Sequence, residues 1–192
     1  IVAHDLASAL TYLHSKNVVH RDLKPENIGF DVRSDVKIFD FGLASQLPQS
    51  RKPYDTFNLT GFTGAPRYMA PEVALSLPYN HKADVYSYGL LMSFMFSLQA
   101  PFEGYNRDEM TKKVYNGRES PRVNLKWPKS LKHLLPRCWD KNLNKRPEFA
   151  EIKDILHKKA TGACAESIFL DTSNRSEKSY RKKLATIKCF EE

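Results

Sequence analysis

Apolar side chains recur at helical spacing at the start of the chain. Val2, Leu6, Leu10 and Leu13 lie three or four residues apart, which places them on one face of a helix. The stripe ends near residue 16, and Asn17 is of a type that adopts the left-handed conformation found after helix C-termini. The pattern predicts a helix from about residue 2 to residue 16.

Two short β-prone runs follow at residues 28–30 and 36–39, and the polar residues 31–35 between them are typical of a turn. This pattern predicts a small hairpin. Such a hairpin carries Asn27 at one end and Asp40 at the other. It therefore brings two oxygen ligands together.

The rest of the chain, to about residue 160, is predicted to be mainly helical. Residues 43–69 are rich in Ser, Thr, Gly and Pro and lack periodicity, which predicts a long loop, and loops of this length in compact domains are usually functional or disordered. Residues 83–98 are apolar nearly all round, as expected of a buried central helix. Further helices are predicted at Pro71 and near residues 108–115, 131–139 and 147–158. The predicted fold class is mainly α: a helical bundle around a buried central helix, with a small β-hairpin.

The formal net charge of +8 is concentrated in residues 107–160. Basic and apolar residues are interspersed there, which favours the solvated face of packed helices over a nucleic-acid surface. After residue 160 the pattern weakens, so residues 161–192 are predicted to be a separate basic tail that frays. The alternative for this tail is an amphipathic basic helix near residues 180–187 that binds a partner or an anionic membrane.

Three cysteines, Cys138, Cys164 and Cys189, have no closely spaced partner. This argues against a disulfide framework or a zinc site and favours a reducing, cytoplasmic (intracellular) location. No apolar run approaches the roughly 20 residues of a transmembrane segment. The chain starts at Ile1, already within the helical pattern, so we expect it to begin inside a longer open reading frame.

The sequence His-Arg-Asp-Leu-Lys-Pro-Glu-Asn occupies residues 20–27. It holds a carboxylate (Asp22), an ammonium (Lys24) and a carboxamide (Asn27) within six positions. Its proline disfavours helix at the preceding residue, so the three groups lie on a constrained loop. One of them can accept a proton, one can neutralise a phosphate and one can ligate a hard cation. A second carboxylate, Asp40, opens Asp-Phe-Gly thirteen residues later.

These two stretches match the H-R-D-L-x-x-x-N and D-F-G signatures, so the chain resembles a protein kinase from residue 1 to about residue 160. Further landmarks follow in that family's order: Ala-Pro-Glu at residues 70–72, Asp84 in Asp-Val-Tyr-Ser-Tyr-Gly, and Arg146 in Lys-Arg-Pro. The last of these is similar to the tyrosine-kinase-like group, and Lys24 is what serine/threonine kinases carry. The resemblance implies the C-terminal lobe of such a kinase, because the glycine-rich loop of the N-terminal lobe is not among these residues.

The resemblance implies transfer of the γ-phosphoryl group of ATP to a protein Ser/Thr hydroxyl. Asp22 would orient that hydroxyl and accept its proton, and Lys24 would neutralise the γ-phosphate. Asn27 and Asp40 would hold Mg²⁺, so ATP and Mg²⁺ are the expected cofactors and a Ser/Thr-containing protein is the expected substrate. The resemblance assigns structural roles to the remaining matched residues: His20, Phe41, Asp84 and the ion pair of Glu72 with Arg146.

Arg21, directly before the catalytic aspartate, is what kinases have when a phosphorylated activation loop controls them, because an arginine can bind the phosphate. We favour Thr60 and Thr63 as the phosphorylated residues, since neighbouring glycines leave the loop free to reorganise. The other candidate hydroxyls in this loop belong to Ser45, Ser50 and Thr56.

Ala65 stands where serine/threonine kinases usually have a Thr or Ser that hydrogen-bonds the catalytic aspartate. A dual-specificity or tyrosine kinase is therefore a lesser alternative. The N-terminal lobe supplies much of the ATP clamp, so we expect no measurable kinase activity from this chain alone and activity from a parent chain that includes that lobe. The alternative from another class is a truncated, non-catalytic interaction module that keeps kinase residues by descent.

Overall fold

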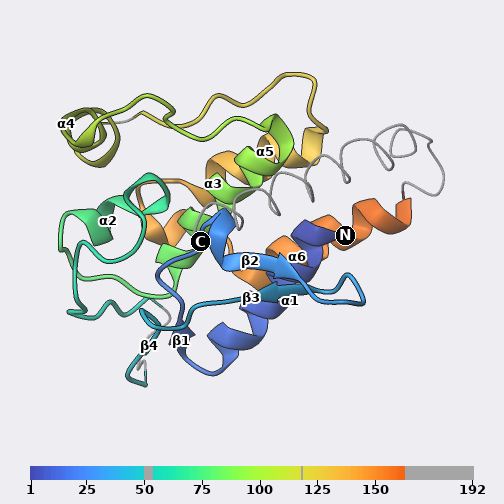
Figure 1. Ribbon diagram of the computed structural model, residues 1–192, viewed down its shortest axis with the longest axis horizontal. Coiled ribbons are helices and arrows are strands. Elements are labelled where there is room, and N and C mark those ends of the chain that lie inside the picture. The colour runs from blue at the N-terminus through green and yellow to red at the C-terminus, as the bar shows by residue number, and fades with distance from the viewer. Residues whose placement is uncertain (50–53, 118, 163–192) are drawn as a thin grey trace.

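The structure is a computed structural model that describes residues 1–49, 54–117 and 119–162 (Figure 1). Its helices are α1 (Val2–Ser15), α2 (Pro71–Ala74), α3 (Lys82–Ser97), α4 (Arg107–Glu109), α5 (Lys129–Cys138) and α6 (Phe149–Gly162). Short 3₁₀ turns are η1 (Pro25–Asn27), η2 (Pro66–Tyr68) and η4 (Leu143–Lys145), and η3 (Met110–Tyr115) is a π-helix. The strands are β1 (Val18–Val19), β2 (Ile28–Phe30), β3 (Val36–Ile38) and β4 (Ser45–Gln46).

Helices predominate in these ranges, which confirms the mainly α prediction at that level. The predicted phosphorylation candidate Ser50, the cysteines Cys164 and Cys189, and nearly all of the predicted tail at 161–192 lie outside the described residues. Within the described ranges, none of the helices has the length and apolar character needed to cross a membrane.

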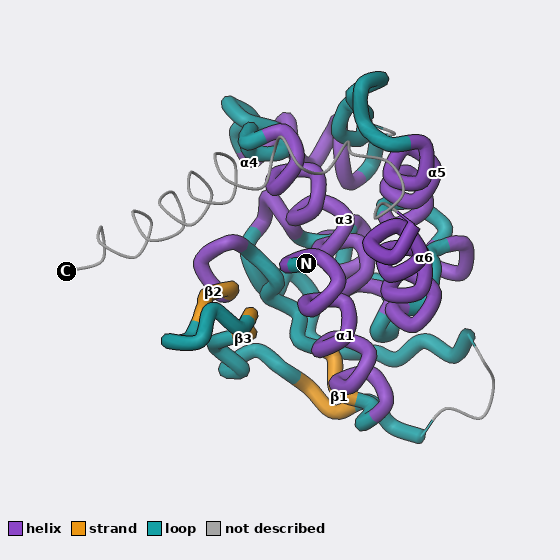
Figure 2. Tube along the Cα trace, turned by 90° about the vertical axis from the view of Figure 1, so that its right-hand side faces the viewer, coloured by secondary structure: helices purple, strands orange, loops and turns teal. Residues whose placement is uncertain are grey.

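Helix α1 follows the predicted bounds closely. Leu6 and Leu10 of its apolar stripe are fully buried. Asn17 has a φ of 56°, and its backbone N–H donates to the carbonyl of His14 at 2.9 Å, so the predicted left-handed residue after the helix is confirmed. The buried face of α1 packs along α6, and both helices lie beside α3 (Figures 1 and 2).

The predicted hairpin is confirmed as an antiparallel pair of β2 and β3. Ile28 pairs with Ile38 and Phe30 pairs with Val36. The register continues beyond the strands, because the backbone N–H of Phe39 donates to the carbonyl of Asn27 at 2.8 Å. Asp40 therefore follows directly after the residue that is bonded to Asn27.

A second strand pair was missed by the sequence reasoning. β1 and β4 are antiparallel, with Val18 opposite Gln46 and Val19 opposite Ser45. Farther along, Phe57 forms an isolated bridge with Tyr79. The stretch 43–69, predicted to be a loop, is thus tied to the rest of the fold at several points. Two-residue strands have no periodicity to detect, so only their long-range pairing reveals them.

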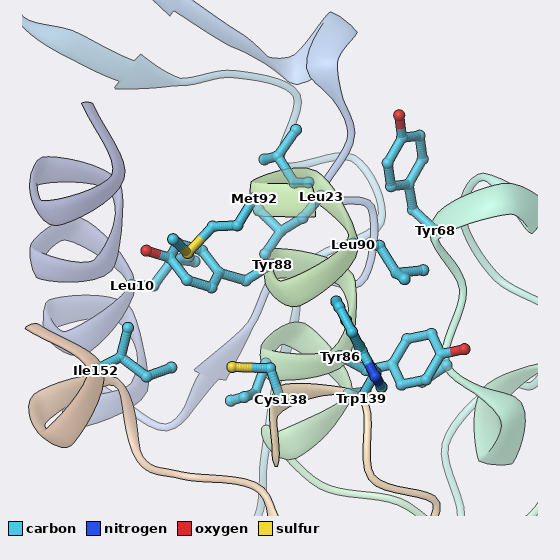
Figure 3. Close-up of a cluster of buried hydrophobic side chains, with 14 of the residues drawn as sticks. Leu10, Leu23, Tyr68, Tyr86, Tyr88, Leu90, Met92, Cys138, Trp139 and Ile152 are labelled. Carbon is cyan, nitrogen blue, oxygen red and sulfur yellow. The ribbon is translucent and has the colours of Figure 1, made fainter. Parts of the chain in front are cut away.

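Helix α3 is the buried centre of the molecule, as predicted. Every residue from Lys82 to Ser93 is buried, including polar ones. Figure 3 shows Tyr88 and Met92 of this helix among side chains from the surrounding helices, with Leu10 of α1 and Ile152 of α6 beside them. This burial on all sides explains why the helix is apolar nearly all round.

The remaining helices differ from the predictions at their ends. The helix predicted near 108–115 is a three-residue α-turn followed by a π-helix. Helix α5 begins two residues earlier than predicted, at Lys129, and α6 begins two residues later, at Phe149. Helix α6 also continues to Gly162, past the boundary predicted at residue 160. Helix ends depend on local caps, which periodicity does not report.

Candidate functional site

A buried carboxylate on the central helix holds the catalytic-type loop in place. Asp84 is 1% exposed, and its two oxygens accept the backbone N–H groups of His20 at 2.8 Å and Arg21 at 2.9 Å. His14 of α1 bonds the same carboxylate at 2.9 Å. Burial raises the pKa of Asp84, but these hydrogen bonds outweigh burial and hold that pKa below its usual value. The carboxylate therefore stays charged and anchors the loop to α3.

The imidazole of His20 connects this loop to the Asp-Phe-Gly turn. Its Nδ1 accepts the backbone N–H of Asp22 at 3.3 Å, so Nε2 carries the proton and donates to the carbonyl of Phe39 at 3.1 Å. The ring also packs edge-on against Phe41, with ring centroids 5.0 Å apart. His20 thus orients both halves of the site through packing and hydrogen bonds.

Both carboxylate oxygens of Asp22 are held by neighbouring groups. Oδ1 accepts the backbone N–H of Ala65 at 2.8 Å. Oδ2 lies 2.9 Å from Lys24 Nζ and accepts from Asn27 Nδ2 at 3.0 Å. The side chain is only 5% exposed. This arrangement fixes the direction of the carboxylate, so a small group that reaches it meets a preorganised proton acceptor.

The bond from Ala65 bears on the hydroxyl that this position lacks. Ala65 has no hydroxyl for the aspartate, but its backbone N–H occupies that role from the same chain position. Gly64 makes this approach possible: its φ is +97°, and a Cβ there would lie 2.3 Å from the carbonyl oxygen of Arg21. In the sequence, the one sign of this close backbone approach is the glycine directly before Ala65.

Lys24 is the positive charge nearest to the acceptor. Burial lowers its pKa, but the hydrogen bond to Asp22 and the fields of Asp22, Glu26 and Asp40 outweigh burial, so the pKa lies above its ordinary 10.5. Lys24 therefore remains an ammonium at neutral pH. It also lines an open cavity of about 520 Å³ together with Glu26, Ala65 and Arg67.

Asn27 and Asp40 offer oxygen atoms that suit a hard cation. The Nδ2 group of Asn27 donates to Asp22 twice, at 2.8 and 3.0 Å, which leaves its Oδ1 as the atom that can ligate. Asp40 is exposed, and its Oδ1 accepts the N–H of Gly42 at 3.1 Å. Within the described ranges no cluster of three or more Asp, Glu, His or Cys side chains could hold a metal. The donor set fits Mg²⁺, which takes few protein oxygens and completes its shell with phosphate and water.

The predicted ion pair of Glu72 and Arg146 is confirmed. The guanidinium of Arg146 bonds the carboxylate of Glu72 through both terminal nitrogens, at 2.5 and 2.9 Å. Both side chains are buried. The pair joins α2 to the turn before α6. It makes no contact with Asp22, so its role is to support the fold.

The two favoured phosphorylation candidates differ in accessibility. Thr60 is exposed, whereas Thr63 is only 9% exposed and its hydroxyl donates to the carbonyls of Thr60 and Gly61, both at 3.1 Å. The guanidinium of Arg21 is already bonded, through Nε to the carbonyl of Leu43 at 2.6 Å and through another nitrogen to a tyrosine hydroxyl. A phosphate on Thr63 would require the segment to open.

Comparisons with known proteins agree with this geometry. A family model described as "Protein kinase domain" matches residues 1–158. The chain is 37% identical to the dual specificity protein kinase shkB of Dictyostelium discoideum, over 79% of this chain and 23% of that protein. It is 35% identical to the serine/threonine/tyrosine-protein kinase HT1 of Arabidopsis thaliana, over 82% of this chain and 39% of that protein. It is 36% identical to the serine/threonine-protein kinase VIK of the same plant, over 81% of this chain and 36% of that protein. The chain spans well under half of the length of each of these relatives.

Proposed function

Because this chain belongs to the protein kinase family, we propose that it supplies the catalytic lobe of an ATP-dependent protein serine/threonine kinase. One observation carries the proposal: the Asp22 carboxylate is held by the Ala65 N–H on one oxygen and by Lys24 and Asn27 on the other. Such a carboxylate matches what phosphoryl transfer needs, which is positioning and charge neutralisation. The names of the relatives, which include serine/threonine kinases, support the same activity.

In the proposed reaction the oxygen of a substrate Ser or Thr hydroxyl attacks the γ-phosphorus of ATP. A bond forms between that oxygen and phosphorus, the bond from phosphorus to the β–γ bridging oxygen breaks, and ADP leaves. Asp22 receives the hydroxyl proton as general base, and Lys24 offsets negative charge on the transferred group. Asn27 and Asp40 would hold Mg²⁺, which neutralises charge on the phosphates when bound.

We propose that a second, ATP-binding lobe completes the active site in the full-length protein. These 192 residues include no glycine-rich loop. Phe39, Phe41 and Leu43, near the site, are 40%, 48% and 37% exposed, and a second lobe would cover them. Positioning supplies about 7–11 kcal/mol of a barrier, whereas a general base supplies about 10²–10⁴ in rate. We therefore expect no measurable transfer from this chain alone.

The choice of acceptor hydroxyl rests on two residues with opposite indications. Lys24 is what serine/threonine kinases carry, while Ala65 lacks the usual hydroxyl. The backbone bond from Ala65 keeps the Asp22 carboxylate oriented without that hydroxyl, and the proposal of Ser/Thr as the main acceptors rests on Lys24. Some relatives are named dual specificity kinases, so phospho-amino-acid analysis should include tyrosine.

We further propose that the kinase lobe comprises residues 1–160, that residues 161–192 form a separate tail, and that the protein acts inside the cell. Cys138, a buried free thiol, is compatible with a reducing compartment. Thr60, rather than Thr63, is the proposed regulatory phosphorylation site, because Thr60 is exposed and Thr63 is buried with its hydroxyl bonded. Arg21 would contact the added phosphate.

The test compares Asp22→Asn with Asp35→Asn in the full-length protein, using radiolabelled ATP and a generic protein substrate. Asp35 is an exposed acid in the hairpin turn and serves as the control. We expect Asp22→Asn to lower the transfer rate by a factor of about 10²–10⁴ and Asp35→Asn to leave it unchanged. Equal rates for wild type and Asp22→Asn would refute the proposed role. Absence of transfer by the wild type would favour the non-catalytic module.

A further inference from the structure

Tyr79 bonds to the segment before Ala65 through its backbone. Its N–H donates to the carbonyl of Phe57 at 3.1 Å, and the N–H of Phe57 donates to the carbonyl of Tyr79 at 2.9 Å. The tyrosine is completely buried although it lies in the connection between α2 and α3. No sequence motif marks this residue.

The hydroxyl of Tyr79 reaches two further groups. It donates to the carbonyl of Thr60 at 2.9 Å and accepts from the guanidinium of Arg21 at 3.3 Å. Arg21 in turn donates through Nε to the carbonyl of Leu43. One buried hydroxyl therefore joins the residue before Asp22 to the segment that carries Thr60.

The order of this segment reaches the proton acceptor. Beyond Thr60, the N–H of Phe62 donates to the carbonyl of Val73 at 2.7 Å. Three residues later the N–H of Ala65 holds Asp22 at 2.8 Å. Loosening the segment at Thr60 would therefore weaken the hydrogen bond from Ala65 that orients Asp22.

We propose that Tyr79 is a positioning residue that orders segment 57–65 against the catalytic loop without a phosphate. Its effect on catalysis rests on the proposed kinase function; its effect on order does not. In this arrangement the Tyr79 hydroxyl bonds one guanidinium nitrogen of Arg21 and the carbonyl of Thr60, so phosphorylation of Thr60 would act on a segment that is already ordered.

The first test is hydrogen exchange of the 192-residue chain after phosphatase treatment, with mass spectrometry to verify that no phosphate remains. Tyr79→Phe removes one hydroxyl, and Tyr88→Phe is the matched control because its buried hydroxyl donates to the carbonyl of Ala3 at 2.7 Å, outside the segment. A net hydrogen bond accounts for about a fivefold change in an opening equilibrium. We expect the Phe57, Phe62 and Ala65 amides to exchange about fivefold faster in Tyr79→Phe and at the wild-type rate in Tyr88→Phe.

Two further measurements on the same chain make the proposal refutable even if Tyr79→Phe folds poorly. The wild-type amides of segment 57–65 should be protected without phosphate; exchange at the rate of an unstructured peptide would overturn the proposal. Thr60→Ala should keep wild-type protection, since Tyr79 bonds the backbone of Thr60. Loosening by Thr60→Ala equal to that by Tyr79→Phe would overturn it as well.

The second test measures kinetics in the full-length protein. Tyr79→Phe should lower kcat/KM for the protein substrate about fivefold and leave the KM for ATP unchanged, while Tyr88→Phe changes neither. Unchanged kcat/KM would overturn the positioning role. If the exchange results hold but the full-length protein transfers no phosphate, the kinase function fails and the ordering by Tyr79 stands.

Discussion

Asp22 depends on groups that come from two distant parts of the chain. Lys24 and Asn27 are local partners, whereas the N–H of Ala65 comes from 43 residues away. Gly64 allows the distant partner to approach. The orientation of the Asp22 carboxylate therefore depends on the backbone conformation of residues 64 and 65.

Replacing Gly64 with Ala tests this dependence. The φ of +97° costs about 1–2 kcal/mol for an L-residue, and a Cβ at 2.3 Å from the Arg21 carbonyl adds overpacking of about 1–3 kcal/mol. Gly104→Ala is the control, because its φ is +84° and nothing lies within 4 Å of the added Cβ. Urea unfolding should show a larger loss for Gly64→Ala; equal losses would mean that the contact with Arg21 relaxes freely.

Glu148 gives a pH dependence at the residue scale. Its oxygens lie 2.5 Å from Lys82 Nζ and 3.1 Å from His81 Nε2. Burial raises the pKa of Glu148, but these partners outweigh burial and lower the pKa from 4.5 to about 2. A depressed pKa means that the ionised carboxylate stabilises the fold above pH 4.5 and that this stabilisation is lost as the pH falls toward 2.

We therefore expect the difference in unfolding free energy between wild type and Glu148→Gln to be largest above pH 4.5 and to shrink on acidification. Chemical denaturation at pH 7, 5, 4 and 3 measures it. Glu103→Gln is the control, since Glu103 is exposed and has no ion pair within the described part of the chain. A difference for Glu148→Gln that does not vary with pH would contradict the expectation.

At the scale of elements, α3 positions the site and one buried ion pair braces the region after it. Asp84, near the start of α3, holds the loop by accepting the backbone N–H groups of His20 and Arg21. Arg146, before α6, bonds Glu72 of α2 and also donates to the carbonyl of Lys82 in α3 at 3.0 Å. These contacts link α2, α3 and the turn before α6, so the proposed catalytic loop rests on a rigid frame.

Glu72→Gln should be far more costly than a surface equivalent. It leaves the buried guanidinium of Arg146 without its counter-charge, which typically costs about 3–5 kcal/mol. Glu151→Gln breaks an exposed pair with Arg137, for which about 0–1 kcal/mol is expected. Thermal and urea unfolding of both variants measure the contrast. Similar stabilities for the two variants would show that the Glu72 pair does not brace the fold.

At the scale of the whole molecule, helices enclose α3 while the apolar side chains near the Asp-Phe-Gly turn stay partly exposed. Phe39, Phe41 and Leu43 are neighbours in sequence and each is more than a third exposed. The main apolar cluster is buried around α3 (Figure 3), and other large apolar side chains, such as Val32 and Leu125, are exposed elsewhere along the chain. The grouping of Phe39, Phe41 and Leu43 beside the turn fits the second lobe proposed above.

The isolated 192-residue chain is accordingly expected to self-associate through this surface as its concentration rises. Sedimentation velocity over a concentration series measures the association. Phe41→Ser should weaken it, whereas Val32→Ser, at a fully exposed position in the hairpin turn, should not. A monodisperse monomer at high concentration would contradict the expectation.

Sequence patterns were enough to indicate the family, the candidate reactive groups and the main helices. Motif spacing indicated Asp22, Lys24, Asn27 and Asp40 as candidate site residues, because the type and spacing of these side chains match the kinase signatures. Periodicity located α1 and the buried α3, and the alternation of β-prone and polar runs located the hairpin. These features are local, so a short window of sequence contains the information.

Which distant groups meet depends on the tertiary fold. The Ala65 N–H bonds Asp22 across 43 positions of the chain. The Tyr79 hydroxyl bonds Thr60 across 19 positions and Arg21 across 58. The pairing of β1 with β4 is likewise a contact between distant segments. The same packing exposed Thr60 and buried Thr63, which the sequence left equivalent. Backbone N–H groups and carbonyls make most of these contacts, and residue identity does not report where a backbone group points.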